Sequence, residues 1–411
     1  MKILKKESCL MTTRRDVLKY VSGLSLSLLV DPFYRSAFAN SKSENTQDSW
    51  ETSGFVMGSG MKERRLHADQ LCPCEGAPGN IIAGNFSGTK FKSISTQFLP
   101  HQIVQNPRNL EQLFAFQKWG EHGIEVSLSS EKTQALVLPK DHYFYGHAVM
   151  SPGGDHVLVG GMDQARAVGV LLAYHTKTLK LENIQLTYGV HPHDMQLSLD
   201  QKHLWIANSG ATPKFRKKLK PKEDITLISN MARIDLASGK LVEQVLMDHG
   251  DKMYAHFVIV DEGNFICFGL TGAKEGSETL PSAMASIKDQ KVVDLMANPI
   301  VASAVGEALS ARKTLDGKKI VVTLPLTNAM AILDINGQPI RMIRNIESPK
   351  SLFYSPDSSL LIVSQMNGPM KAYSSRNDSL SSLGGIAGIK GANASKWLGT
   401  GSHGTEIIWP A

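Results

Sequence analysis

Cysteine is scarce in this sequence, with four residues in a chain of 411. Secreted scaffolds held together by disulfide bonds use more cysteine than this, so that class of protein is disfavoured. Cys72 and Cys74 are separated by a single residue. Thioredoxin-like motifs and zinc-binding pairs use a two-residue spacer, and no second pair is present to complete a zinc site.

Motifs of several large enzyme classes are also missing. The sequence contains no phosphate-cradling glycine-rich loop, no Gly-x-Ser-x-Gly nucleophile elbow and no zinc-peptidase helix. Of the formal net charge of +6, the first 39 residues carry +4, because seven Lys or Arg face three Asp or Glu there. The rest of the chain is close to neutral, which disfavours a nucleic-acid-binding function.

The N-terminal segment has the pattern of a twin-arginine signal peptide, which we expect over residues 1–39. An uncharged stretch from Tyr20 to Val30 is too short to span a bilayer as a helix. No later run of apolar residues is long enough to span a membrane, so we predict export to the periplasm by the twin-arginine translocase and no transmembrane segment in the mature protein. The paired arginines and the small-x-small cleavage site are Arg14, Arg15, Ala37 and Ala39.

A turn followed by a strand recurs along the rest of the chain. Each copy begins with turn residues of the Pro-Asp-Gly type and continues into a short apolar run rich in β-branched or aromatic residues. An apolar stretch precedes most of these turns, so each copy predicts two antiparallel strands joined by a tight turn. The turns begin at Ser151, Ser198, Asp261, Thr314 and Ser355.

A third strand and a more polar fourth strand follow most of these pairs. Four antiparallel strands repeated roughly every 40 to 60 residues are typical of a β-propeller blade. Strands near Asn80 and Lys90 would complete a last blade begun by C-terminal segments at Ile386, Lys396 and Glu406. We therefore predict an all-β, seven-bladed β-propeller over residues 56–411, closed by N- and C-terminal strands that share the last blade, with six or eight blades as alternatives. Residues 40–55 are expected to form a flexible polar tether.

Three motifs resemble segments of the domain-of-unknown-function 1513 family. They are Tyr143-Phe-Tyr-Gly-His-Ala-Val-Met, Gly189-Val-His-Pro-His-Asp-Met and Trp205-Ile-Ala-Asn-Ser-Gly. The resemblance covers most of the mature chain and implies a quinoprotein-like propeller exported by the twin-arginine route. Genes of this family often stand beside those of imelysin-type periplasmic proteins, which implies a part in iron acquisition. One departure is Ala255, where the family often has arginine before a histidine.

Histidines occupy equivalent positions in four predicted blades. Each lies four or five residues before the turn between the first two strands, at the entry to the innermost strand; they are His101, His147, His193 and His256. Asp194 shares this register, and His191 could face the same way on an extended segment. Imidazoles that converge with a carboxylate suit iron, copper or zinc, so we predict a metal site at one mouth of the central channel.

Two other interpretations of these histidines stay open. Gly-His before an inner strand is common in propellers, where the imidazole forms hydrogen bonds within or between blades, and an organic cofactor could also occupy the position. Ser310 and Ser351 have the same register in later blades, so a metal would be held to one side of the channel.

A dense basic run lies in a long insertion between strands. It is either a solvated loop or a contact for an acidic partner or an anionic surface. Its residues are Lys214, Arg216, Lys217, Lys218, Lys220 and Lys222.

The function that these patterns favour is non-enzymatic. We expect a periplasmic propeller that binds a metal or a protein partner and is accessory to iron acquisition, with periplasmic iron-uptake proteins as partners. The alternatives are an oxidoreductase that uses a metal or quinone at the channel mouth and a structural scaffold for protein interactions, since propellers host all of these activities.

Overall fold

The computed structural model describes most of the chain from residue 51 onwards. The described residues are 51–60, 78–211, 216–217, 220, 225–246, 253–261, 264–271, 282–288, 291–294, 298–301, 304, 308–355, 360–365, 370–382 and 405–410. Of residues 60, 406–407 and those described within 253–294, only the backbone is considered. The expected signal peptide and most of the expected tether therefore lie outside the described residues.

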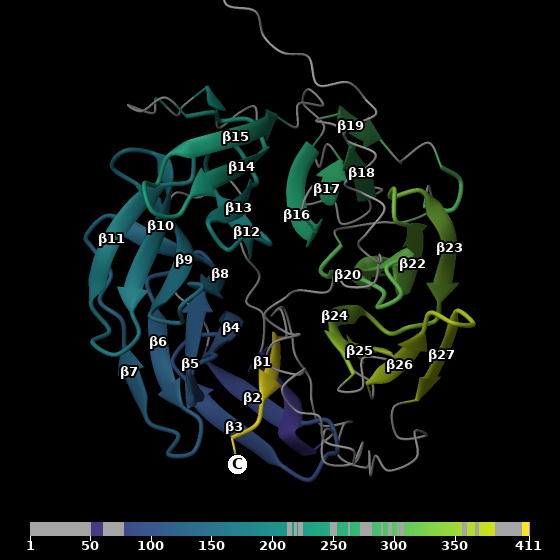
Figure 1. Ribbon diagram of the computed structural model, residues 1–411, viewed down its shortest axis with the longest axis horizontal. Coiled ribbons are helices and arrows are strands. Elements are labelled where there is room, and N and C mark those ends of the chain that lie inside the picture. The colour runs from purple at the N-terminus through teal and green to yellow at the C-terminus, as the bar shows by residue number, and fades with distance from the viewer. Residues whose placement is uncertain are drawn as a thin grey trace, which may run out of the picture.

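Antiparallel sheets of four strands surround a common axis, and the described residues form seven of them (Figure 1). Six sheets each use four strands that are consecutive in the sequence. The first three of these contain β4 (Pro100–Asn106), β5 (Asn109–Gln117), β6 (Gly123–Ser127) and β7 (Thr133–Ala135); β8 (His142–Met150), β9 (His156–Asp163), β10 (Val168–His175) and β11 (Leu181–Leu186); and β12 (Pro192–Leu197), β13 (His203–Asn208), β14 (Asn230–Asp235) and β15 (Leu241–Leu246).

The next three sheets follow the same order. They contain β16 (Met253–Asp261), β17 (Asn264–Thr271), β18 (Ser282–Lys288) and β19 (Lys291–Asp294); β20 (Ala311–Lys313), β21 (Lys319–Leu324), β22 (Ala329–Asp334) and β23 (Pro339–Arg344); and β24 (Pro349–Tyr354), β25 (Leu361–Gln365), β26 (Lys371–Ser374) and β27 (Ser379–Ser382). A short 3₁₀ helix, Pro325–Thr327, connects β21 to β22.

The closing sheet is a composite of both ends of the chain. Its strand order is β28-β1-β2-β3, with β1 (Ser53–Gly60), β2 (Gly79–Asn85), β3 (Phe91–Thr96) and β28 (Thr405–Ile408). The predicted all-β propeller is confirmed, as is the sharing of the closing sheet by both ends of the chain. The expected count of seven equivalent blades is corrected, because six blades consist of four consecutive strands and the closing sheet is a composite built mainly by the N-terminal side.

The expected last blade lacked β1, which the structure places between β28 and β2. Three C-terminal segments were expected in it, whereas β28 is its single C-terminal strand among the described residues, and the segments near 386 and 396 lie outside them. β1 pairs with β2 over its length and with β28 over Ser53 to Val56. β1 therefore forms the backbone hydrogen bonds that the extra C-terminal strands were expected to form. It begins at Ser53, inside the expected tether.

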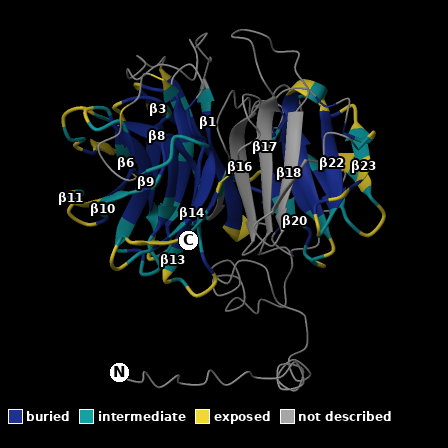
Figure 2. Ribbon diagram, turned by 90° about the horizontal axis from the view of Figure 1, so that it is seen from above, coloured by how far each residue is buried: buried dark blue, intermediate teal, exposed yellow. Residues whose placement is uncertain are grey.

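Apolar side chains fill the space between neighbouring sheets. One cluster joins Phe114 of β5 to Phe144 of β8 and Tyr174 of β10. The strands near the axis are mostly buried, while outer strands such as β11 and β23 are largely half-buried or exposed (Figure 2). Burial of each sheet therefore depends on the next sheet in the ring, as the short apolar repeats predicted.

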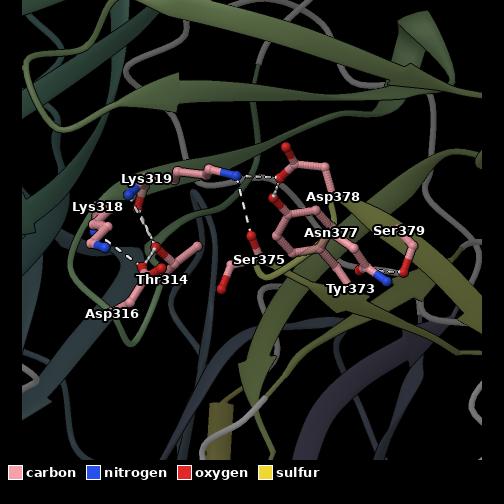
Figure 3. A network of polar contacts seen from close by, with 9 residues as sticks. All are labelled: Thr314, Asp316, Lys318, Lys319, Tyr373, Ser375, Asn377, Asp378 and Ser379. Carbon is pink, nitrogen blue, oxygen red and sulfur yellow. Dashed lines mark hydrogen bonds and ion pairs between the residues drawn. The ribbon is translucent and has the colours of Figure 1, made fainter.

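A polar network joins the sheet of β20–β23 to that of β24–β27 (Figure 3). Lys319 Nζ donates to Asp378 Oδ1 at 2.6 Å and to the Ser375 carbonyl at 3.2 Å. Tyr373 donates its hydroxyl proton to the same carboxylate oxygen at 2.6 Å. Burial raises the pKa of Asp378, but the hydrogen bonds from Lys319 and Tyr373 outweigh it and the net shift is downward. Burial and the carboxylate together raise the pKa of Tyr373, so its hydroxyl stays protonated.

Replacing Asp378 with Asn should lower stability at pH 7 by about 1–2 kcal/mol, because Lys319 and Tyr373 lose a charged acceptor. A carboxylate whose pKa is depressed in the folded state stabilises above its unfolded pKa of about 3.9, and this stabilisation is lost as pH falls through the folded pKa. The difference between Asp378→Asn and the parent protein should therefore shrink as pH falls below about 3.9. Urea unfolding at pH 7 and pH 3 measures it.

The matched control for this change is Asp155→Asn, which removes an exposed ion pair with Arg108. Exposed pairs contribute about 0–1 kcal/mol, so this variant should unfold nearly as the parent does. Equal stabilities of Asp378→Asn and the parent protein at pH 7 would contradict the assigned role of the network.

Deleting residues 405–411 should destabilise the whole propeller. β28 pairs with β1, Gln105 bridges to both backbone groups of Ile408, and Trp409 packs in the core. Loss of the Trp409 side chain alone should cost about 3–5 kcal/mol, and the exposed edge of β1 adds to this. Thermal unfolding measures the effect, with Trp409→Phe as the control that keeps the strand. A truncated protein that melts with the parent would show that closure by β28 is dispensable.

Candidate metal centre

Three of the predicted histidines lie on three neighbouring inner strands. His101 is on β4, His147 on β8 and His193 on β12, and these strands line the axis side by side (Figure 1). All three side chains are buried, with exposed fractions of 3–6%. The repeat therefore brings together residues that are far apart in the sequence.

Each of these histidines sits at an irregularity in the pairing of its strand. The register between β4 and β5 shifts between Pro100 and Gln102, which leaves His101 in the bulge. The register between β12 and β13 shifts between Pro192 and Asp194, at His193. In β8 the shift spans Phe144 to Ala148 and includes His147. Bulges turn a side chain away from the regular alternation of a strand, and they are frequent beside functional sites.

Gly146 has a specific role in the bulge of β8. Its φ of +103° lies in a region that side chains rarely allow. A Cβ atom at this position would lie 2.8 Å from Cδ2 of His101 and 3.0 Å from Cα of Lys118. The Gly-His pair in the sequence thus lets His101 and the backbone of Lys118 approach β8 closely.

The three imidazoles are close enough to share one ion. One nitrogen from each ring can be chosen so that all three atoms lie within 4.8 Å of one another. His101 Nε2 and His147 Nε2 are 3.0 Å apart, and the ring centroids of His147 and His193 are 4.5 Å apart. Two nitrogens bound tetrahedrally at about 2.1 Å from a metal are roughly 3.4 Å apart, so the His101–His147 pair would open by about 0.4 Å and the widest separation would shorten by up to about 1.4 Å.

Two charged side chains adjoin the three histidines. Asp194 Oδ1 lies 3.6 Å from His147 Nδ1, an ion-pair contact slightly longer than a hydrogen bond. Lys118 Nζ lies 3.2 Å from His193 Nε2 and 5.7 Å from the centre of the Tyr145 ring. Asp194 and Lys118 are partly exposed, whereas the three histidines are buried.

His191 is near the cluster but has different surroundings. Its φ of +58° places the backbone in the left-handed region, and its ring stacks on Tyr145 with centroids 5.5 Å apart. Trp119 packs on it at 5.1 Å, and its Nδ1 lies 2.9 Å from the carbonyl oxygen of Gly210. His191 thus supports the aromatic layer behind His193, and it is not one of the three converging histidines.

The fourth predicted histidine lies on the innermost strand of the next sheet. His256 is in β16 and opposes Phe268 of β17 in regular pairing. No bulge occurs at this backbone position, in contrast to the three other histidines, and its side chain lies outside the described residues. Ser310 and Ser351, which share the register of the histidines, are buried in the later blades; Ser310 Oγ accepts a hydrogen bond from the Leu352 backbone N–H, and the Ser351 backbone N–H donates to Ser364 Oγ.

The other predicted residues do not join this cluster. Within the basic run, Arg216 donates to the carbonyl of Ala211 at 2.8 Å, and Lys217 and Lys220 are exposed. The remaining predicted residues lie outside the described part of the chain; they are Lys214, Lys218, Lys222, Cys72, Cys74, Arg14, Arg15, Ala37 and Ala39.

Lys118 is the member of the cluster that the sequence analysis missed. It directly follows β5, in the connection to β6, rather than lying on an inner strand. A signal for it existed in Lys118-Trp119-Gly120, a short connection after an apolar strand, but the repeat register did not include that position.

In the described part of the chain, no helix is long and apolar enough to cross a membrane.

Two solved structures illustrate the fold of this chain. Kuenenia stuttgartiensis hydrazine synthase has a TM-score of 0.55 at 12% identity, with 79% of this chain and 98% of that chain covered. A Bacteroides fragilis protein that carries the provisional name 6-phosphogluconolactonase has a TM-score of 0.54 at 9% identity, with 89% of this chain and 100% of that chain covered. At these identities the likeness concerns the fold alone.

The search of curated proteins found no match. A sequence family matches residues 100–387, which include all three converging histidines and more than half of the chain. The family is described as a protein of unknown function, DUF1513. The resemblance inferred from the three sequence motifs is thereby confirmed. The chain belongs to the DUF1513 family of proteins of unknown function.

Proposed function

We propose that this protein is a periplasmic β-propeller that binds one transition-metal ion through His101, His147 and His193. The observation that carries the proposal is the convergence of three buried imidazoles within 4.8 Å from three separate strands. Bulges in those strands support it, because they aim the three side chains at a common point.

The donor set favours a borderline metal over a hard one. Imidazole suits zinc, copper, iron and nickel, whereas calcium and magnesium prefer oxygen. Asp194 beside His147 Nδ1 resembles the carboxylate that orients a metal-bound histidine. A role as an accessory protein in iron acquisition, with periplasmic partners, remains a prediction from the family resemblance.

A structural role for the histidines is the second candidate. His101 and His147 contact each other at 3.0 Å, and His193 contacts Lys118 at 3.2 Å, so ring nitrogens are engaged without any ion. In that case the cluster would stabilise three adjacent blades, and the protein would act as an interaction scaffold. A redox enzyme with a metal or quinone would instead show visible absorption.

Replacing His193 with Ala should abolish tight binding of zinc or copper to the purified, chelator-treated protein. One of three ligands is then missing, and metal content by mass spectrometry should fall at least tenfold. In the parent protein, a metal at 100 times its dissociation constant should stabilise the fold by about 2.7 kcal/mol. His193→Ala should show no such stabilisation in thermal unfolding.

His122→Ala is the matched control. His122 is exposed, stacks on Phe98 and is not among the three converging histidines, so its loss should leave metal content unchanged. A parent protein that binds neither zinc, copper nor iron would refute the metal proposal. His193→Ala would then lose about 1–3 kcal/mol of stability, through unsatisfied buried partners, and the structural role would stand.

The periplasmic location rests on the paired arginines and has its own test. Changing Arg14 and Arg15 to Lys should leave the precursor in the cytoplasm, because the translocase recognises the arginine pair. Cell fractionation and immunoblotting measure the distribution, and replacing Lys5 and Lys6 with Arg is the control. Unchanged export of the Lys-Lys variant would contradict the twin-arginine route.

A further inference from the structure

We infer that the three-histidine centre takes a small oxyanion, such as a carboxylate or a phosphate, as a further ligand of its metal, with Lys118 as the second contact of that anion. This inference rests on the proposed metal binding. It adds the chemical class of the ligand and assigns a role to Lys118.

The number of protein donors leaves room for such a ligand. Three imidazoles converge, and a tetrahedral or larger coordination sphere needs at least one donor more. Asp194 lies against Nδ1 of His147, whereas Nε2 of the same ring faces His101. Asp194 therefore orients His147 and is not placed as a fourth ligand. An external ligand therefore completes the sphere from the side where Lys118 and Asp194 are partly exposed.

The position of Lys118 indicates that this ligand carries a negative charge. Its ammonium lies 3.2 Å from a ring nitrogen of His193, and its backbone is held against the bulge of β8 beside Gly146. It also lies 5.7 Å from the centre of the Tyr145 ring, and Lys118 is partly exposed. A protonated amine has no lone pair for a metal, so Lys118 is not a ligand and instead provides a positive charge at the site.

Charge balance makes the site unfavourable for a metal alone. A divalent ion among neutral imidazoles would stand within a few ångströms of the Lys118 ammonium, and only Asp194 offsets this charge among the described contacts. Like charges at this separation repel appreciably in a partly buried environment. An anion bound to the metal would reverse the sign of the interaction and accept hydrogen bonds from the ammonium.

Lys118 therefore weakens metal binding when no anion is bound and strengthens it when an anion is bound. Without an anion, the ammonium competes with the metal for the nitrogen of His193 and repels it. With an anion, the ammonium stabilises the ternary complex. The binding of metal and of anion should consequently be positively coupled, each tightening the other.

The test uses the full mature protein loaded with Co²⁺, whose visible absorption reports on its ligands. Lys118→Met removes the charge and keeps the length of the side chain. We expect this variant to bind Co²⁺ about tenfold more tightly than the parent in the absence of anions, because a nearby positive charge is gone. We expect its Co²⁺ form to bind acetate and inorganic phosphate about tenfold more weakly.

Two further variants make the outcome specific. Lys118→Arg keeps the charge and should retain anion binding, and Lys132→Met removes an exposed lysine and should resemble the parent in both measurements. The stronger of the two probes distinguishes a carboxylate ligand from a phosphate.

The failures of the two proposals are distinguishable. If the parent binds no Co²⁺, the metal proposal and this inference both fall. If Co²⁺ binds and anions leave its spectrum unchanged, or if Lys118→Met binds anions as the parent does, only the assignment of Lys118 and the oxyanion falls.

Discussion

Closure of the ring depends on the pairing of β28 with β1. Ser53 opposes Ile408 and Val56 opposes Thr405, while the other edge of β1 pairs with β2. Without this contact the sheet of β1–β3 would have an open edge, and the inner strands on either side of it would lose a packing neighbour. Six sheets can form from local sequence, but the seventh exists because residues separated by more than 300 positions meet.

The same ring geometry brings the candidate site together. β4, β8 and β12 are equivalent inner strands of adjacent sheets, so residues in the same register approach one another near the axis. With regular pairing, each of these side chains would point to the face that the alternation of side chains along its strand dictates. The bulges at His101, His147 and His193 change that direction, and Gly146 provides the backbone conformation that the middle bulge needs.

The surroundings of the three histidines contribute to structure and, under the proposal, also to the binding of a metal. Contacts of 3.0 Å between two imidazoles and of 3.2 Å between Lys118 and His193 hold the cluster in place. The same contacts occupy nitrogen atoms that a metal would use. Lys118 and Asp194 are partly exposed charged groups beside this buried cluster, and each contacts one of its imidazoles.

The sequence by itself determined the all-β repeat, the family and the register of the histidines. Those features depend on short-range turn chemistry and on apolar periodicity, which neighbouring residues encode directly. Only the tertiary structure decided which side chains converge. His191 was expected beside His193, but its left-handed backbone directs it into the aromatic layer of Trp119 and Tyr145. Lys118 joined the site from a connection outside the repeat, and β1 joined the ring from the expected tether, because packing between distant segments places both.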